Sequence, residues 1–329
     1  MQYRTIGTGA AAREVSAICL GAMPFGSVVD EATGFAVLDR FVEAGGTFID
    51  TSNNYISWLP GHQGGESETV LGNWRASRGL GDDDGLVIAT KLGAKPLTPD
   101  GGLEAAEGLS AQAVRSAVEG SRKRLGMDRL DLLYTHIEDR SVALEETVGT
   151  LADLAADDTV GMLGVSNHRT WRVERARQIS RDAGWAGYEV LQYRNSYLQP
   201  RFDIGLPEGG HMHATPELLD YVREEGRTGR APTLVVYTPL LFGAYTRADK
   251  ELSAPYDHPG TAKRMAALRR VATEAGATLN QVVLSWLLDN DPPMIPLLGV
   301  SSLAQLDEVL EATELKLTIE QRALLDEAG

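Results

Sequence analysis

Eight short apolar runs recur along the chain, and longer stretches with the periodicity of amphipathic helices lie between them. Runs that are apolar on both faces and alternate with helices are typical of a parallel sheet that helices cover on its outside. The predicted strands span residues 17–20, 47–51, 86–91, 130–136, 160–166, 190–193, 233–238 and 294–298. The predicted helices span residues 32–44, 66–77, 110–125, 143–156, 170–182, 216–225, 262–275, 279–288 and 303–312.

Eight alternating strand and helix units favour an α/β fold of the (β/α)8 or TIM-barrel type. An open, doubly wound sheet is the alternative, but it would place a Gly-x-Gly-x-x-Gly fingerprint after an early strand, and the chain contains none. Ser110 and Thr215 are predicted helix caps, and Gly126 and Gly276 are predicted stop signals. Composition does not shift along the chain, so residues 1–329 are expected to form one barrel domain.

Polar side chains follow several of the predicted strands. Asp50, Lys91 and His136 end three apolar runs, and Tyr55 lies one short step beyond the first of them. Because chemistry in a barrel sits at the carboxyl ends of the strands, these four side chains are expected to converge. An acid, a phenol, an amine and an imidazole gathered in one place are suited to proton transfer.

The segments that carry these four residues resemble the aldo-keto reductase family. The similarity continues in order through Ser67 to Gly72, Gly164 to Asn167, Gln192, Tyr237 to Leu240 and Ile295-Pro296. It implies a (β/α)8 barrel and nicotinamide-dependent reduction of an aldehyde, ketone or oxidised sugar. Tyr55 would be the general acid, and Lys91 would lower its pKa. Asp50 would hold Lys91 charged, and His136 would hydrogen-bond the carbonyl oxygen.

The same resemblance implies a set of cofactor contacts. Ser166, Asn167 and Gln192 would hold the nicotinamide carboxamide, since amide side chains both donate and accept hydrogen bonds. Tyr237 would stack on the nicotinamide ring, and Leu240 and Arg247 would lie near the pyrophosphate. The remaining expected contacts are Ser301, Gln305 and Glu308, with Glu308 at the adenine.

Two segments depart from the family pattern. Residues 299–309 contain no lysine or arginine, although the family usually grips the 2′-phosphate of NADPH with basic side chains there. Serines at a helix N-terminus can also bind phosphate, so NADP(H) is slightly favoured and NAD(H) remains possible. The loop after Tyr55 is long, and Trp58 in it is a candidate wall of the substrate pocket. His211 and His213 form a His-x-His pair without an evident third ligand, which favours loop packing over a metal site.

The net charge of −15 disfavours nucleic acid and anionic membranes as partners and leaves a small-molecule substrate. The single cysteine, Cys19, excludes a disulfide within the chain and suits a reducing cytoplasm. Neither a signal peptide nor an apolar run long enough to span a bilayer is visible. Oligomeric state cannot be read from the sequence.

Two other functions fit parts of the pattern. One is a non-catalytic, NAD(P)H-binding regulatory subunit, although such a subunit has no need for Tyr55 and Lys91 together. The other is a barrel lyase that uses Lys91 as a Schiff-base amine, which leaves Ser166, Asn167 and Gln192 without a purpose.

Overall fold

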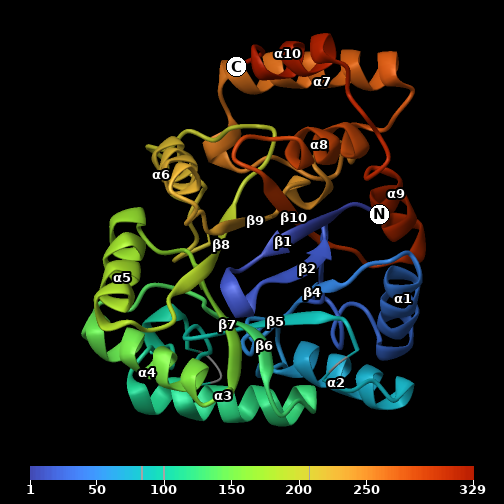
Figure 1. Cartoon of the computed structure of the whole chain (residues 1–329). Coiled ribbons are helices and arrows are strands. Elements are labelled where there is room, and N and C mark those ends of the chain that lie inside the picture. The colour runs from blue at the N-terminus through green and yellow to red at the C-terminus, as the bar shows by residue number, and fades with distance from the viewer. Residues whose placement is uncertain (83, 99–100, 207) are drawn as a thin grey trace.

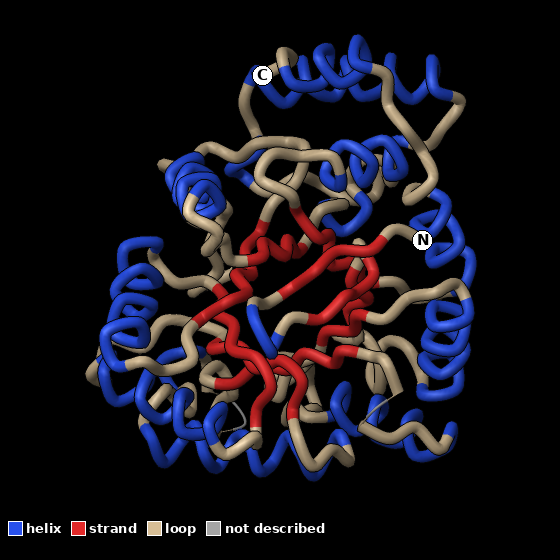
Figure 2. Tube along the Cα trace, viewed as in Figure 1, coloured by secondary structure: helices blue, strands red, loops and turns tan. Residues whose placement is uncertain are grey.

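The computed structural model describes residues 1–82, 84–98, 101–206 and 208–329. Its centre is a closed barrel of eight strands, each parallel to its neighbours, with the helices packed around the outside (Figures 1 and 2). The barrel strands are β3 (Cys19–Gly21), β4 (Phe48–Asp50), β5 (Val87–Leu92), β6 (Leu130–Thr135), β7 (Val160–Ser166), β8 (Tyr188–Arg194), β9 (Thr233–Tyr237) and β10 (Met294–Gly299). The predicted fold class and all eight predicted strands are therefore confirmed.

Helices follow the strands as the sequence pattern predicts. They are α1 (Glu31–Glu43), α2 (Glu66–Arg78), α3 (Ala111–Leu125), α4 (Leu144–Ala156), α5 (Thr170–Ala183), α6 (Pro216–Arg227), α7 (Pro259–Ala275), α8 (Leu279–Leu288), α9 (Leu303–Glu311) and α10 (Ile319–Asp326). The Ser110 and Thr215 side chains accept the capping hydrogen bonds of α3 and α6. Gly126 and Gly276 end α3 and α7 in the left-handed conformation, as a C-terminal glycine does.

An N-terminal hairpin, which the sequence pattern did not predict, precedes the barrel. Its strands, β1 (Tyr3–Ile6) and β2 (Arg13–Ser16), pair antiparallel and lie across one end of the barrel in Figure 1. Ile6 and Val15 are fully buried in the apolar cluster that fills the barrel interior. The hairpin therefore closes the end of the barrel at which the strands begin.

Two apolar layers hold the fold together. The larger lies between the barrel and its helices, and the smaller fills the barrel. Gly164 shows how tightly the interior is packed, because a Cβ atom there would lie 2.5 Å from Cδ1 of Tyr134. Any larger residue at 164 would displace the Tyr134 ring. The centroid of that ring lies 6.0 Å from Nζ of Lys91.

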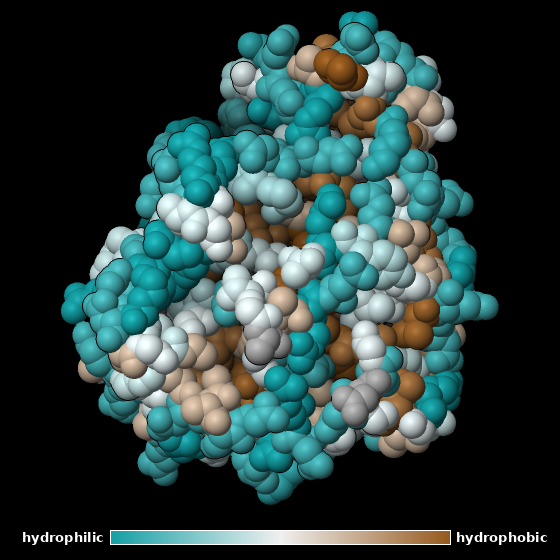
Figure 3. All heavy atoms as spheres, viewed as in Figure 1, coloured by the Kyte–Doolittle hydropathy of each residue, from teal (hydrophilic) through white to brown (hydrophobic). Residues whose placement is uncertain are grey.

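The outer surface is mainly polar. Figure 3 shows the hairpin side of the molecule, where hydrophilic residues dominate and hydrophobic ones gather mostly in the hollows between elements. Helix α10, the second element that the sequence pattern did not predict, packs against α7 (Figure 1). Within the described residues, no helix combines the length and the apolar character that crossing a membrane requires.

A partly buried carboxyl at the start of β6, that of Asp131, gives the fold a pH-dependent stability. Burial raises the pKa of Asp131 to about 6, and a hydrogen bond from the Ile88 amide (2.9 Å) opposes this shift only in part. The pKa of Asp131 in the folded protein is above its unfolded value of about 3.9. Its contribution to stability is therefore greatest below about pH 3.9. This stabilisation is lost as the pH rises through about 6.

Asp131→Asn is therefore expected to raise the free energy of unfolding at neutral pH by at most about 3 kcal/mol, because it removes the buried charge. Thermal unfolding between about pH 4 and pH 8 measures the effect, which should vanish at the acid end. The exposed neighbour Asp128, as Asp128→Asn, is the matched control. An equal shift at every pH would contradict the assignment of the effect to Asp131 ionisation.

Candidate active site

Four side chains meet at the carboxyl end of the barrel as the sequence predicts. Asp50 and Lys91 are fully buried, and Tyr55 and His136 are each 8 % exposed. Lys91 Nζ contacts Asp50 Oδ1, the backbone oxygen of Thr51 (2.8 Å) and the Tyr55 hydroxyl (2.5 Å). The Tyr55 hydroxyl donates to Asp50 Oδ1 (3.0 Å). Each of the three Lys91 ammonium protons therefore has an acceptor, and the Tyr55 proton has one as well.

The electrostatics of this cluster correct one expectation. The pKa of Tyr55 is raised well above its ordinary value, chiefly by burial and then by the charge of Asp50. Lys91 was expected to lower that pKa, but burial and Asp50 outweigh it. Burial also lowers the pKa of Lys91, while Asp50 opposes that shift. A phenol in this setting holds its proton at neutral pH.

His136, the fourth residue of the cluster, packs against Tyr55. The two rings are edge to face, with centroids 6.1 Å apart. Burial and the charge of Lys91 place the pKa of His136 well below its usual value, so the imidazole is neutral near pH 7. Its Nδ1 lies 3.2 Å from Oγ of Ser52, a contact that the sequence did not indicate.

The backbone next to Tyr55 is strained. Ile56 has φ 61° although it is β-branched and buried, a conformation that costs about 1–3 kcal/mol. Asn167 (φ 57°) and Thr238 (φ 55°) show the same feature at the ends of β7 and β9. Non-glycine residues in left-handed conformations thus cluster where the predicted site residues lie.

The residues expected to hold a nicotinamide carboxamide lie on adjacent strands. Ser166 Oγ donates to the backbone oxygen of Gln192 (2.9 Å) and accepts from Asn167 Nδ2 (3.0 Å). Gln192 Nε2 donates to Asp50 Oδ2 (2.8 Å), which ties this group to the four central residues. Each of the three side chains is at most 2 % exposed. Buried hydroxyl and amide groups at this place fit a planar amide ligand, and Tyr237 at the end of β9 fits an aromatic ring beside it.

The other predicted cofactor contacts lie further out and have partners of their own. Arg247 is half exposed and pairs with Asp249. The Ser301 hydroxyl and amide both donate to Gln305 Oε1 (3.1 and 2.8 Å) at the start of α9. Glu308 Oε1 accepts from Thr278 (2.7 Å) and Asn280 (3.3 Å). Leu240 begins the short 3-10 helix Leu241–Gly243 after β9.

Trp58 is 58 % exposed in the loop after Tyr55, so its role in walling the substrate pocket stays a prediction. His213 packs edge-on against Phe202 and Tyr256, as loop packing implies. Across the described residues, no group of three or more potential ligands could hold a metal ion.

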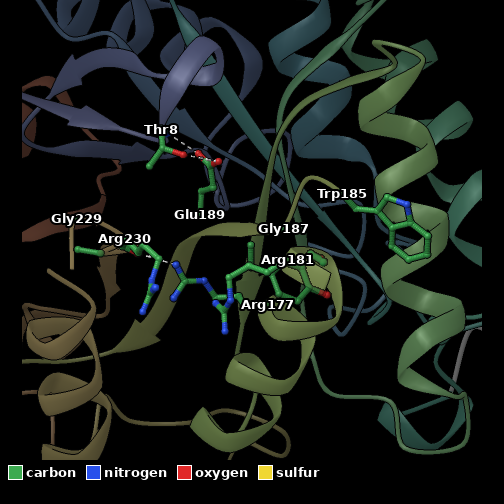
Figure 4. A pocket seen from close by; sticks show the side chains of 11 residues that line it. Thr8, Arg177, Arg181, Trp185, Gly187, Glu189, Gly229 and Arg230 are labelled. Carbon is green, nitrogen blue, oxygen red and sulfur yellow. Dashed lines mark hydrogen bonds between the residues drawn. The ribbon is translucent and has the colours of Figure 1, made fainter. Parts of the chain in front are cut away.

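A cleft in the surface lies away from these residues. Arg177, Arg181, Trp185 and Glu189 are among its lining residues, and Thr8 of the hairpin turn contacts Glu189 (Figure 4). Tyr188 and Glu189 stand at the beginning of β8, so this cleft lies at the amino end of the barrel. Arg177 pairs with Glu225 (3.0 Å), which leaves its charge compensated. Barrel enzymes place their chemistry at the opposite end.

Comparisons with known proteins agree with the geometry. The model of the aldo/keto reductase family matches residues 17–329. The chain is 31% identical to norsolorinic acid reductase B of Aspergillus parasiticus, over 99% of this chain and 84% of that protein. It is 28% identical to the uncharacterized oxidoreductase YrpG of Bacillus subtilis, over 99% of this chain and 95% of that protein.

Among solved structures, the thermostable aldo-keto reductase Tm1743 in complex with the inhibitor epalrestat has the same fold. It superimposes with a TM-score of 0.75 at 24% identity, and the match covers both chains completely. The family match over most of the chain decides the class, and the chain belongs to the aldo/keto reductase family of NAD(P)H-dependent oxidoreductases that act on carbonyl groups.

Proposed function

We propose that this protein reduces the carbonyl group of a small aldehyde or ketone with Tyr55 as the proton donor. The contact of Lys91 Nζ with both Asp50 and the Tyr55 hydroxyl carries the proposal. A nicotinamide cofactor supplies the hydride when it is bound. Ser166, Asn167 and Gln192 would hold its carboxamide, with the Asn167–Ser166 hydrogen bond given up for contacts to it, and Tyr237 would cover its ring.

The protein groups have distinct tasks in this proposal. Tyr55 donates its proton to the carbonyl oxygen as negative charge develops there. Lys91 then stabilises the phenolate with its ammonium group, and Asp50 keeps that ammonium charged at a fully buried position. His136 would hydrogen-bond the carbonyl oxygen and orient it. Residues 1–329 would act together as one barrel domain.

The other candidate functions fit the site less well. A regulatory subunit that only binds the cofactor would gain nothing from a buried Lys91, which is costly to desolvate. A Schiff-base amine must reach a substrate carbonyl, whereas Lys91 Nζ already contacts three oxygens at full burial. The direct test is loss of reduced-cofactor absorbance with a panel of aldehydes, ketones and oxidised sugars. No turnover with any member would count against the proposal.

The relatives named norsolorinic acid reductase make norsolorinic acid a natural member of that panel. Trp58, exposed near Tyr55, would then form a wall of the pocket. We also propose a modest preference for NADPH, bound through the Ser301 and Ser302 hydroxyls at the N-terminus of α9.

Fluorescence titration with NADPH and NADH measures that preference. Ser301→Arg is expected to tighten NADPH binding about tenfold, since a guanidinium adds a charge-assisted contact to phosphate. It should leave NADH binding almost unchanged, because NADH lacks the 2′-phosphate. An equal gain for both cofactors would place the arginine at the shared pyrophosphate and contradict the proposed position of Ser301.

A further inference from the structure

The loop between β8 and α6 brings one more titratable side chain to the mouth of the site. This loop spans residues 195–215, all described except residue 207. Its last part folds back along the end of β8, where the Arg194 amide donates to Met212 O (2.9 Å) and the Ala214 amide to Arg194 O (2.8 Å). His211 precedes this paired stretch, so its backbone is anchored to the barrel.

His211 is close to the four central residues. A Cβ atom on Gly210 would lie 3.4 Å from Ile137, the residue after His136, so the loop passes directly beside the end of β6. The His211 ring meets the Tyr237 ring edge to face, with centroids 5.5 Å apart. His211 therefore contacts the residue proposed to cover the nicotinamide, and its neighbour Gly210 lies beside the residue that follows His136.

Hydrogen-bond donors and acceptors determine which His211 nitrogen carries the proton. Backbone groups fix the Asn167 amide at both ends, since Nδ2 donates to His136 O (3.1 Å) and Oδ1 accepts from the Met212 amide (3.0 Å). The Tyr237 hydroxyl lies 2.8 Å from the same Oδ1 and must donate to it. A phenol has one proton, so its oxygen must accept from His211 Nδ1 at 3.1 Å.

The imidazole of His211 is neutral at physiological pH. Burial lowers its pKa, and the charges of Arg194 and Lys91 lower it further against the opposing charge of Glu208. A neutral imidazole with its proton on Nδ1 has a bare Nε2, which can only accept a hydrogen bond. Nδ1 makes the ring's one hydrogen bond within the described part of the chain.

We propose that His211 Nε2 accepts a hydrogen bond from a hydroxyl group of the substrate, so that this protein prefers carbonyl compounds that also carry a hydroxyl. This assignment rests on the proposed function, because it places His211 beside the reacting carbonyl. It makes His211 a specificity-determining residue at a site where Tyr55 supplies the proton.

The kinetic test uses benzaldehyde and its three hydroxy and three methoxy isomers with the full-length protein and NADPH. At about pH 6 the phenols are protonated. A methoxy group puts an oxygen atom at the same ring position as the hydroxyl, but it has no proton to donate. At least one hydroxy isomer is expected to exceed its methoxy partner about tenfold in kcat/KM.

That ratio should fall to about one in His211→Leu. It should persist in His211→Gln, whose amide offers an acceptor to the substrate and a donor to Tyr237. His213→Leu is the matched control, because His213 packs against Phe202 and Tyr256 in the same loop. Its ratio should equal that of the unchanged protein.

A spectroscopic readout tests the donor chain without turnover. Nitrogen-15 NMR distinguishes the two neutral tautomers, and comparison with His211→Gln identifies the His211 signal among the six histidines. The proton is expected on Nδ1, and Tyr237→Phe should remove that preference. A proton on Nε2 would overturn the proposal.

The kinetic outcomes separate this proposal from the proposed function. Turnover of the panel without any hydroxyl preference, or a preference that survives in His211→Leu, would overturn the role of His211 alone. Absence of turnover with all seven benzaldehydes would overturn this proposal, and only absence of turnover with every aldehyde, ketone and oxidised sugar of the wider panel would overturn the proposed function as well.

Discussion

Tyr55→Phe is expected to lower kcat for carbonyl reduction by about 10³-fold while the Kd for NADPH stays unchanged. General acid catalysis contributes typically 10²–10⁴-fold to a reaction rate. Phenylalanine keeps the aromatic ring but removes the hydroxyl that Lys91 contacts and that donates the proton. The raised pKa of Tyr55 keeps the phenol protonated at neutral pH, so the residue enters the reaction in its acid form. Stopped-flow or steady-state absorbance gives kcat, and fluorescence titration gives Kd.

Tyr188→Phe is the matched control for this substitution. Tyr188 is also buried in a barrel strand, and its hydroxyl accepts from Thr135 (3.2 Å) rather than from Lys91. Tyr188→Phe removes a buried phenol oxygen in the same way, but its kcat should stay within about twofold of that of the unchanged protein. If Tyr55→Phe retained more than about a tenth of the turnover, Tyr55 would not be the acid and another group, such as His136 or water, would supply the proton.

The positions of Asp50, Lys91 and His136 could be predicted because of a simple regularity in the sequence. Each follows an apolar run, and parallel strands in a closed barrel end on the same face. Strand identity therefore placed these side chains together before any contact was known. The family resemblance implied the pairing of Asp50 with Lys91. The contact of His136 with Ser52 could not be predicted, because it depends on the conformation of the loop after β4.

The sign of the Tyr55 pKa shift shows why such contacts matter. The residue types alone indicated a phenol beside an ammonium, which lowers the pKa of the phenol. In the structure, burial and the Asp50 charge prevail. Depth of burial is a property of the whole barrel, so no local motif carries it.

Two elements outside the eight-unit pattern were missed for different reasons. The hairpin strands β1 and β2 have four residues each, too short to stand out by alternation alone. Helix α10 had a readable signal, since Thr318 and Gln321 form a capping box at its start. The sequence marked His211 only as half of a His-x-His pair, because its contacts come from Tyr237 and Asn167, which are distant in sequence.

Lys91→Met is expected to abolish turnover and also to destabilise the fold by about 3–5 kcal/mol, since it leaves the Asp50 carboxylate buried without its partner. Both side chains are fully buried, so solvent does not screen the lost interaction. Urea unfolding followed by circular dichroism measures the change. The exposed pair Lys123–Glu119 (3.2 Å) is the control, and Lys123→Met there should cost at most about 1 kcal/mol.

The double variant Lys91→Met with Asp50→Asn separates the two roles of the lysine. Removing the carboxylate charge as well should recover much of the lost stability, because no unpaired charge then stays buried. Turnover should not recover, because the ammonium next to Tyr55 is still missing. A double variant as unstable as Lys91→Met would mean that Met packs poorly against the Tyr55 and Tyr134 rings. The loss of stability would then come from poor packing rather than from an unpaired buried charge.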